Sequence, residues 1–86
     1  MKGHSGGISS VSISSDGKRI VTGGNDKLAM IWDAKTQIKL GDSLKGHSDI
    51  IKSVCFSPDG NLIVTGSDDK LAMIWDANTG AKIGDY

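Results

Sequence analysis

The sequence is one unit of 43 residues written twice, and this repeat constrains the fold more than any other feature. The stretch Asp26 to Ala34 recurs unchanged as Asp69 to Ala77, and about 27 of the 43 paired positions are identical. Repeats of this length are typical of architectures in which each unit packs only against its neighbours. We therefore predict two domains, residues 1–43 and residues 44–86, and we expect function to reside in the repeats.

Each unit has the pattern of four short strands separated by tight turns. The strands are expected at 8–14, 19–23, 28–33 and 37–45, and again at 51–57, 62–66, 71–76 and 80–86. Pro58, Asp59 and Gly60 form a turn signal, because proline presets φ at the second turn position and Gly60 accepts a positive φ. The sequence therefore predicts an all-β fold of two four-stranded antiparallel sheets.

The third strand of each unit is apolar on both sides. In the first unit Leu28, Met30 and Trp32 lie on one face, while Ala29 and Ile31 lie on the other. A small sheet of this kind must be covered on both faces to keep apolar surface out of water. Each unit is thus expected to need a neighbour on either side.

Composition excludes several classes of partner. Ten basic and ten acidic side chains give zero formal charge, and the lysines are spread singly through the chain. Nucleic acid and anionic membranes are therefore not expected as partners. The longest apolar runs, such as Leu28 to Trp32, fall far short of the roughly 20 residues that cross a bilayer, and no signal-peptide pattern follows Met1. A cytoplasmic location is expected.

Catalytic, metal and phosphate sites are also not expected. Each His with an Asp and a Thr suggests a hydrolytic triad, but the Thr lies within a strand and the set recurs in both units. Two His residues in different units and the lone Cys55 do not have zinc-ligand spacing, and Cys55 is expected to be buried. The glycines of residues 3–7 precede a strand rather than a helix, which argues against a phosphate loop. No enzyme activity, metal or cofactor is predicted.

The repeated residues resemble the WD repeat of β-propellers. The resemblance rests on Gly-His, Ser-Pro-Asp-Gly, Gly-Ser-Asp-Asp-Lys and Ile-Trp-Asp in order, and it covers the chain twice. The family implies a ring of four-stranded blades around a central channel. It also implies a scaffold for protein interactions, without catalysis.

The resemblance further implies a buried hydrogen-bonded tetrad in each blade. Its members would be His4, Thr22, Asp26 and Trp32 in the first blade, and His47, Thr65, Asp69 and Trp75 in the second. The chemistry is coherent, because the carboxylate can accept from the imidazole while the hydroxyl accepts from the indole N–H and donates to the other imidazole nitrogen. The tetrad is interpreted as structural.

A binding face is implied where the family commonly meets its ligands, on the loops that precede the first strand and follow the second. The candidates are Ser5 and Asn25 in the first blade, and Ser48, Asp49, Ile50 and Asp68 in the second. Apart from Ile50 these residues are small or polar. Proteins or peptides are therefore the expected partners on this face, without a particular one being indicated.

Two blades cannot close a ring, so the chain is expected to assemble with copies of itself. Tyr86 aligns with Ser43 and Met1 with Leu44, which places a chain junction at Met1 and Tyr86. Head-to-tail contacts that close give a cyclic oligomer. Three, four or five chains would give six, eight or ten blades, and the tetramer with eight is favoured because family rings cluster at seven or eight. Residues 1–43 carry net charge +2 and residues 44–86 carry −2, which is consistent with alternating blades.

Three functions are compatible with these features. The first is a self-assembling propeller, either engineered or a natural fragment, that serves as a scaffold. The second is a two-blade piece of a larger WD-repeat protein that binds other proteins. The third is a propeller that binds a sugar or another small ligand, for which exposed loop aromatics would be needed.

Overall fold

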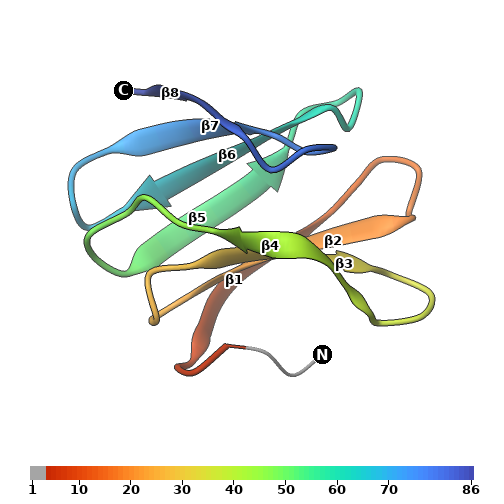
Figure 1. The fold of residues 1–86 in the computed structure, drawn as a ribbon, viewed down its shortest axis with the longest axis horizontal. Helices are drawn as coiled ribbons and strands as arrows, with labels where there is room; N and C mark the ends of the chain where they lie inside the picture. Colours follow the sequence, from red (N-terminus) through yellow and green to blue (C-terminus); the bar gives the residue numbers. More distant parts are fainter. Residues whose placement is uncertain (1–3) are drawn as a thin grey trace.

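The computed structural model describes residues 4–86 and consists of two four-stranded antiparallel sheets packed face to face (Figure 1). The first sheet, blade 1, has the order β1 (Ile8–Ile13), β2 (Arg19–Gly24), β3 (Ala29–Asp33), β4 (Lys39–Leu44). The second sheet, blade 2, has the order β5 (Ile51–Phe56), β6 (Leu62–Ser67), β7 (Ala72–Asp76), β8 (Lys82–Asp85). The predicted all-β fold with two four-stranded blades is confirmed. Within residues 4–86, no helix is long and apolar enough to span a membrane.

The turns between the first two strands of each blade follow the predicted chemistry. Gly60 has φ of 76° and its twin Gly17 has φ of 72°. The Asp59 carboxylate accepts hydrogen bonds from the Ser57 hydroxyl at 2.6 Å and from the Asn61 amide at 3.0 Å. These side-chain bonds satisfy groups that the reversing backbone leaves unpaired.

The fourth strand of blade 1 starts later than predicted, because the preceding turn is longer. Gln37 was expected to open the strand, but it has φ of 64° and its amide donates to the Asp33 carbonyl at 2.8 Å. The Asp33 carboxylate also accepts from the amides of Lys35 and Thr36. This closed turn ends only at Lys39, where β4 begins, and β4 runs to Leu44, one residue beyond the domain limit expected from the repeat.

The core of the structure lies between the two blades, where β5 packs against β1 and β2. The buried cluster contains Val21, Ala29, Ile31 and Leu44 from blade 1, and Ile51, Val54, Phe56, Ile63, Met73, Trp75 and Ala77 from blade 2. Val54 and Phe56 of β5 face blade 1, so the intervening Cys55 faces away and is exposed. The prediction of a buried Cys55 is therefore wrong, because strand alternation places it on the side of blade 2 that no other element among residues 4–86 covers.

Gly23 sets how closely the blades approach. A Cβ at this position would lie 2.6 Å from Ile51 Cγ2 and 2.9 Å from Val54 Cγ1. Its φ is not in the left-handed region, so the glycine is required here by the neighbouring blade and not by the local backbone.

We predict that Gln37→Gly stabilises the fold by about 0.5 to 1 kcal/mol, because a non-glycine residue in the left-handed region is strained. The second unit already has a glycine at the twin position, Gly80, with φ of 78°. Gly80→Gln is the matched reverse change and should cost a similar amount. The midpoint of urea denaturation measures both. Equal midpoints for wild type and Gln37→Gly would contradict the strain.

Candidate functional site

In blade 2 four side chains from four different segments form a continuous chain of hydrogen bonds. The Trp75 indole N–H on β7 donates to the Thr65 hydroxyl oxygen on β6 at 3.0 Å. That hydroxyl lies 2.6 Å from Nε2 of His47, in the loop before β5. His47 Nδ1 lies 2.8 Å from a carboxylate oxygen of Asp69, in the β6–β7 turn. Since the carboxylate can only accept, Nδ1–H donates to it, and Nε2 of the neutral imidazole then accepts from the Thr65 hydroxyl.

Blade 1 repeats this arrangement. The Trp32 indole N–H donates to the Thr22 hydroxyl oxygen at 2.9 Å, and that hydroxyl lies 2.6 Å from His4 Nε2. His4 Nδ1 lies 3.0 Å from Asp26 Oδ2. The structure thus places the eight residues of the sequence-derived tetrads in two sets of four with the same connectivity.

The two Asp carboxylates also hold backbone from two loops. Asp69 accepts from the Ser48 amide at 3.0 Å and from the Leu71 amide at 2.9 Å. Asp26 accepts from the amides of Ser5 and Leu28 in the same way. Each chain of hydrogen bonds therefore fastens the loop that enters a blade to the turn between its second and third strands.

The pKa of Asp69 is set by two opposing influences. Burial alone would raise the pKa, but the hydrogen bonds from His47 and from the Leu71 and Ser48 amides outweigh it and lower the pKa from 3.8 to about 2. The pKa of Asp26 is lowered in the same manner, against the effect of burial, by His4 and the amides of Leu28 and Ser5. Both carboxylates are thus anionic acceptors near neutral pH.

The tetrads lack the features of a hydrolytic triad. Thr22 and Thr65 are fully buried, and each hydroxyl is engaged both as an acceptor from indole and as a donor to imidazole. A nucleophile needs access to substrate and a base free to take its proton. Across the described part of the chain, no buried side-chain N or O lacks a hydrogen-bond partner, and no group of three or more His, Cys, Asp or Glu residues could hold a metal ion. The geometry is that of a structural support.

The candidate binding-face residues lie at one end of the molecule, where the β2–β3, β4–β5 and β6–β7 connections meet (Figure 1). Within each blade the structure brings the two loops together. The Asn25 amide donates to the Gly7 carbonyl at 2.8 Å, and the Asp68 amide donates to the Ile50 carbonyl at 3.1 Å. Asp49 accepts at its carbonyl from Ser67 Oγ at 3.1 Å.

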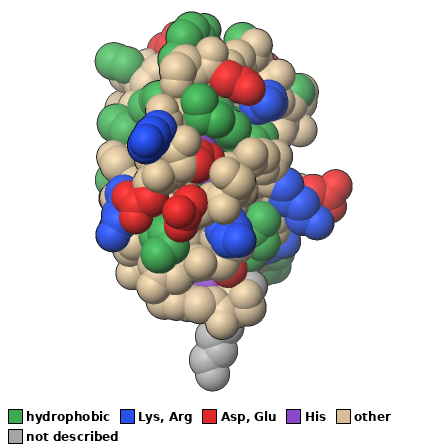
Figure 2. Space-filling model, turned by 90° about the vertical axis from the view of Figure 1, so that its left-hand side faces the viewer, with side chains coloured by type: hydrophobic (Ala, Val, Ile, Leu, Met, Phe, Trp, Pro, Cys, Tyr) green, Lys and Arg blue, Asp and Glu red, His purple; other side chains and the backbone are tan. Residues whose placement is uncertain are grey.

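Figure 2 looks onto this end, where acidic, basic and hydrophobic side chains are interspersed and His shows only as small areas. Lys52 and Asp68 lie 3.8 Å apart on this surface and are both largely exposed. A mixed, exposed surface of this kind has no single charge that would select one class of ligand.

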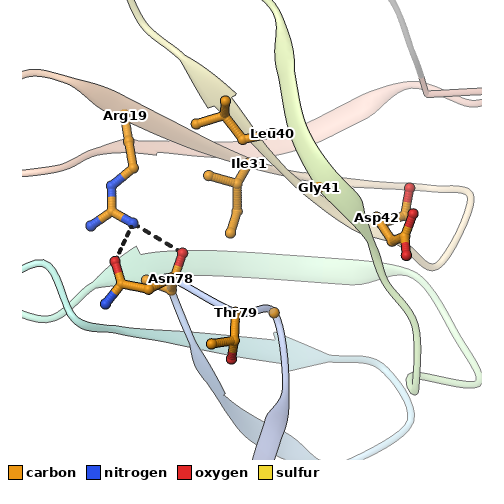
Figure 3. Close-up of a pocket in the computed structure, with 10 residues that line it drawn as sticks. Arg19, Ile31, Leu40, Gly41, Asp42, Asn78 and Thr79 are labelled. Atoms are coloured by element: carbon orange, nitrogen blue, oxygen red, sulfur yellow. Dashed lines mark hydrogen bonds between the residues drawn. The ribbon is translucent and has the colours of Figure 1, made fainter.

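A second feature, which the sequence did not reveal, is the side chain of Arg19 at the interface of the blades. From the start of β2 its guanidinium reaches blade 2 and donates to the Ala77 carbonyl at 2.9 Å and to Asn78 Oδ1 at 3.2 Å (Figure 3). It also donates to the Gly60 carbonyl at 2.5 Å. It also lies 5.5 Å from the centre of the Phe56 ring, a cation–π distance.

Arg19 forms one end of a groove of about 530 Å³ between the blades. Ile31 and Leu40 line its middle, and Asp42 lies at the far end from Arg19 (Figure 3). The one sign of this role in the sequence is the difference between the two units, because Leu62 stands at the twin position of Arg19.

The predicted chain junction is described at one of its two residues. The Tyr86 amide donates to the Ala72 carbonyl at 2.7 Å, and the Ala72 amide donates to the Tyr86 carbonyl at 3.0 Å. Tyr86 thus extends the outer strand of blade 2. Met1 lies outside the described residues.

Two consecutive four-stranded meanders, packed face to face and each fastened by the same buried tetrad, define a pair of propeller blades. The family model described as "WD domain, G-beta repeat" matches residues 1–33 and 38–76. The chain therefore belongs to the WD-repeat family, as its motifs predicted, and proteins of this family generally act as non-catalytic interaction scaffolds. A comparison with curated proteins found no match.

We predict that Thr65→Val lowers the free energy of unfolding by about 2 to 4 kcal/mol. The change is nearly isosteric, but it leaves the Trp75 indole N–H and His47 Nε2 buried without a partner, at about 1 to 3 kcal/mol each. Urea denaturation followed by Trp fluorescence measures the loss. Thr79→Val is the control and should cost less than about 1 kcal/mol, because its hydroxyl accepts from the Ala81 amide at 3.2 Å in an exposed turn where water can replace it. Equal stability of the two variants would contradict the role of the tetrad.

We also predict that acid weakens the fold in a defined pH range. The pKa of Asp69 is lower in the folded state, so its ionised form favours folding, and this contribution is complete above the ordinary value of 3.8. The contribution is lost as pH falls through about 2. Denaturation midpoints measured across this range should decline, and Asp69→Asn should decline less steeply because it has no carboxyl to protonate. Parallel profiles would contradict the pKa shift.

Proposed function

We propose that the chain is a self-assembling propeller module that acts as a protein-interaction scaffold without catalysis. The observation that carries this proposal is the contrast between twin positions in the two blades. Residues that are buried between the blades have exposed twins, 43 residues away in the other repeat, on the two outer faces. This pattern is expected when the outer faces form the same kind of interface with further copies of the chain.

The contrast is clearest on the first strand of each blade. Ile51, Val54 and Phe56 of β5 pack against blade 1 and are 0%, 6% and 7% exposed. Their twins on β1, which we call the β1 face, are Ile8, Val11 and Ile13, and they are 48%, 60% and 58% exposed. An apolar row of this kind on a soluble surface is typical of an interaction site.

The face of blade 2 that points away from blade 1 carries the surface that would pack against a β1 face. Val21 in blade 1 is fully buried against blade 2, whereas its twin Val64 is 42% exposed. Leu62, Val64 and Gly66 together form what we call the β6 face. The β6 face has the side chains to receive a β1 face, so head-to-tail contacts would cover both apolar surfaces.

Closure of such contacts into a ring would give an even number of blades. We favour a tetramer with eight blades, and the trimer and pentamer are the neighbouring alternatives. Proteins or peptides are the proposed partners, on the end that carries Ser5, Asn25, Ser48, Asp49, Ile50 and Asp68. The sugar-binding alternative has little support, because Tyr86 is the one exposed aromatic residue within the described chain. A cytoplasmic location and the absence of nucleic-acid and membrane partners remain part of the proposal.

Native mass spectrometry tests the assembly. We expect one dominant species at four times the chain mass of 9.0 kDa, and it should persist on dilution to low micromolar concentration. Species at three or five chain masses would revise the blade number and leave self-assembly intact. A species at 9.0 kDa over the whole concentration range would overturn the proposal.

A further inference from the structure

We infer that a second copy docks its β1 face on the β6 face in the geometry of the interface within the chain, with Gly66 at the point of closest approach and Leu62 against Ile13 and Lys35 of the second copy. This inference rests on the proposed self-assembly and specifies its contacts. It also identifies the interface between copies as chemically different from the interface within the chain.

Gly66 has no evident role within a single chain. A Cβ at this position would meet only Ser53 Cβ, at 4.0 Å, and the φ of Gly66 is not in the left-handed region. A glycine inside a strand weakens the strand and often marks close approach of another backbone or side chain. Its twin Gly23 shows such an approach, because a Cβ there would collide with Ile51 and Val54. Ile8 and Val11 of a second copy would occupy the same positions against Gly66.

The twin of Arg19 is the second observation. Arg19 contacts Phe56, Asn78 and the carbonyl of Gly60 across the interface within the chain. The twins of Phe56 and Asn78 are Ile13 and Lys35. An arginine at position 62 would therefore face a lysine of the second copy, and like charges at close range are unfavourable. Leucine at this position instead offers an aliphatic surface to Ile13 and to the stem of Lys35.

Two further polar contacts of the interface within the chain are made by residues that differ from their twins. The Ser9 hydroxyl donates to the Ile51 carbonyl, and the Ser15 hydroxyl donates to the Pro58 carbonyl at 2.9 Å. The twin of Ser15 is Pro58, which has no side-chain donor. The twin of Ser9 is Lys52, whose ammonium lies 3.8 Å from the Asp68 carboxylate. The interface between copies is therefore held mainly by apolar contact. An assembly built this way should separate into intact two-blade chains before either chain loses its own interface.

The same substitution at the twin glycines tests the close approach. Gly66→Ala should leave the fold of the single chain intact, with unchanged circular dichroism, and should weaken assembly by about tenfold or more in concentration-dependent sedimentation. Gly23→Ala should instead lower the thermal stability of the chain itself, because its Cβ collides within the chain. Assembly of Gly66→Ala at wild-type concentrations would overturn the inference.

A charge pair gives an independent test that does not depend on a glycine. Leu62→Arg should weaken assembly by about tenfold, because the new charge faces Lys35 of the second copy. Lys35→Asn alone should have little effect. The double variant restores the Arg and Asn pairing found within the chain and should recover assembly to within about threefold of wild type.

The outcomes separate the inference from the proposed function. A wild-type chain that never assembles would contradict self-assembly itself. A wild-type chain that assembles, with Leu62→Arg weakened equally in the presence and absence of Lys35→Asn, would contradict the docking geometry while self-assembly stands. If Gly66→Ala fails to fold, the presence or absence of coupling between positions 62 and 35 decides the inference.

Discussion

The structure depends on one constraint, which is that each blade is a small sheet with apolar side chains on both faces. A sheet of this kind loses stability unless both faces are removed from water. Within the chain each blade covers one face of the other, through the cluster that contains Val21, Ile51 and Val54. Two faces are left over, and they carry many of the apolar side chains that the covered faces carry, such as Ile8, Val11 and Val64. The proposed self-assembly therefore rests on the same apolar patterning that forms the fold.

The hydrogen-bonded tetrads make this packing possible at the loop end of each blade. Loops that bring backbone and polar side chains into an apolar interior must satisfy those groups, or the burial becomes unfavourable. His47 and Asp69 do so by linking the loop before β5 to the β6–β7 turn, and Thr65 and Trp75 continue the chain into the strands. Within residues 4–86 each buried side-chain N or O has a hydrogen-bond partner, so the tetrads tie the loops firmly to the strands.

The sequence predicts the fold well because its signals are local and occur twice. The strands and the turn at Gly60 follow from motif and spacing, and the grouping of the eight tetrad residues follows from the resemblance to the WD repeat. The features that the sequence did not predict correctly belong to residues whose conformation or surroundings have no signal in the local sequence. Gln37 carries no local signal for a positive φ, and only its twin Gly80 hints at one. The exposure of Cys55 depends on which face of blade 2 has a neighbour, and the contacts of Arg19 are made across an interface that no single repeat contains.

Differences between the two units are informative for the same reason. Positions that hold a blade together, such as the tetrads, are identical in both, because each blade needs the same internal support. Ser9, Ser15 and Arg19 make contacts to blade 2, and all three differ from their twins. A duplicated unit in a symmetric ring would have one kind of interface throughout. Ser10, Val21 and Gly23 also face blade 2 and are identical to their twins. Under the proposed assembly, the interface between chains would therefore keep the apolar contacts of the interface within the chain and lack part of its polar ones.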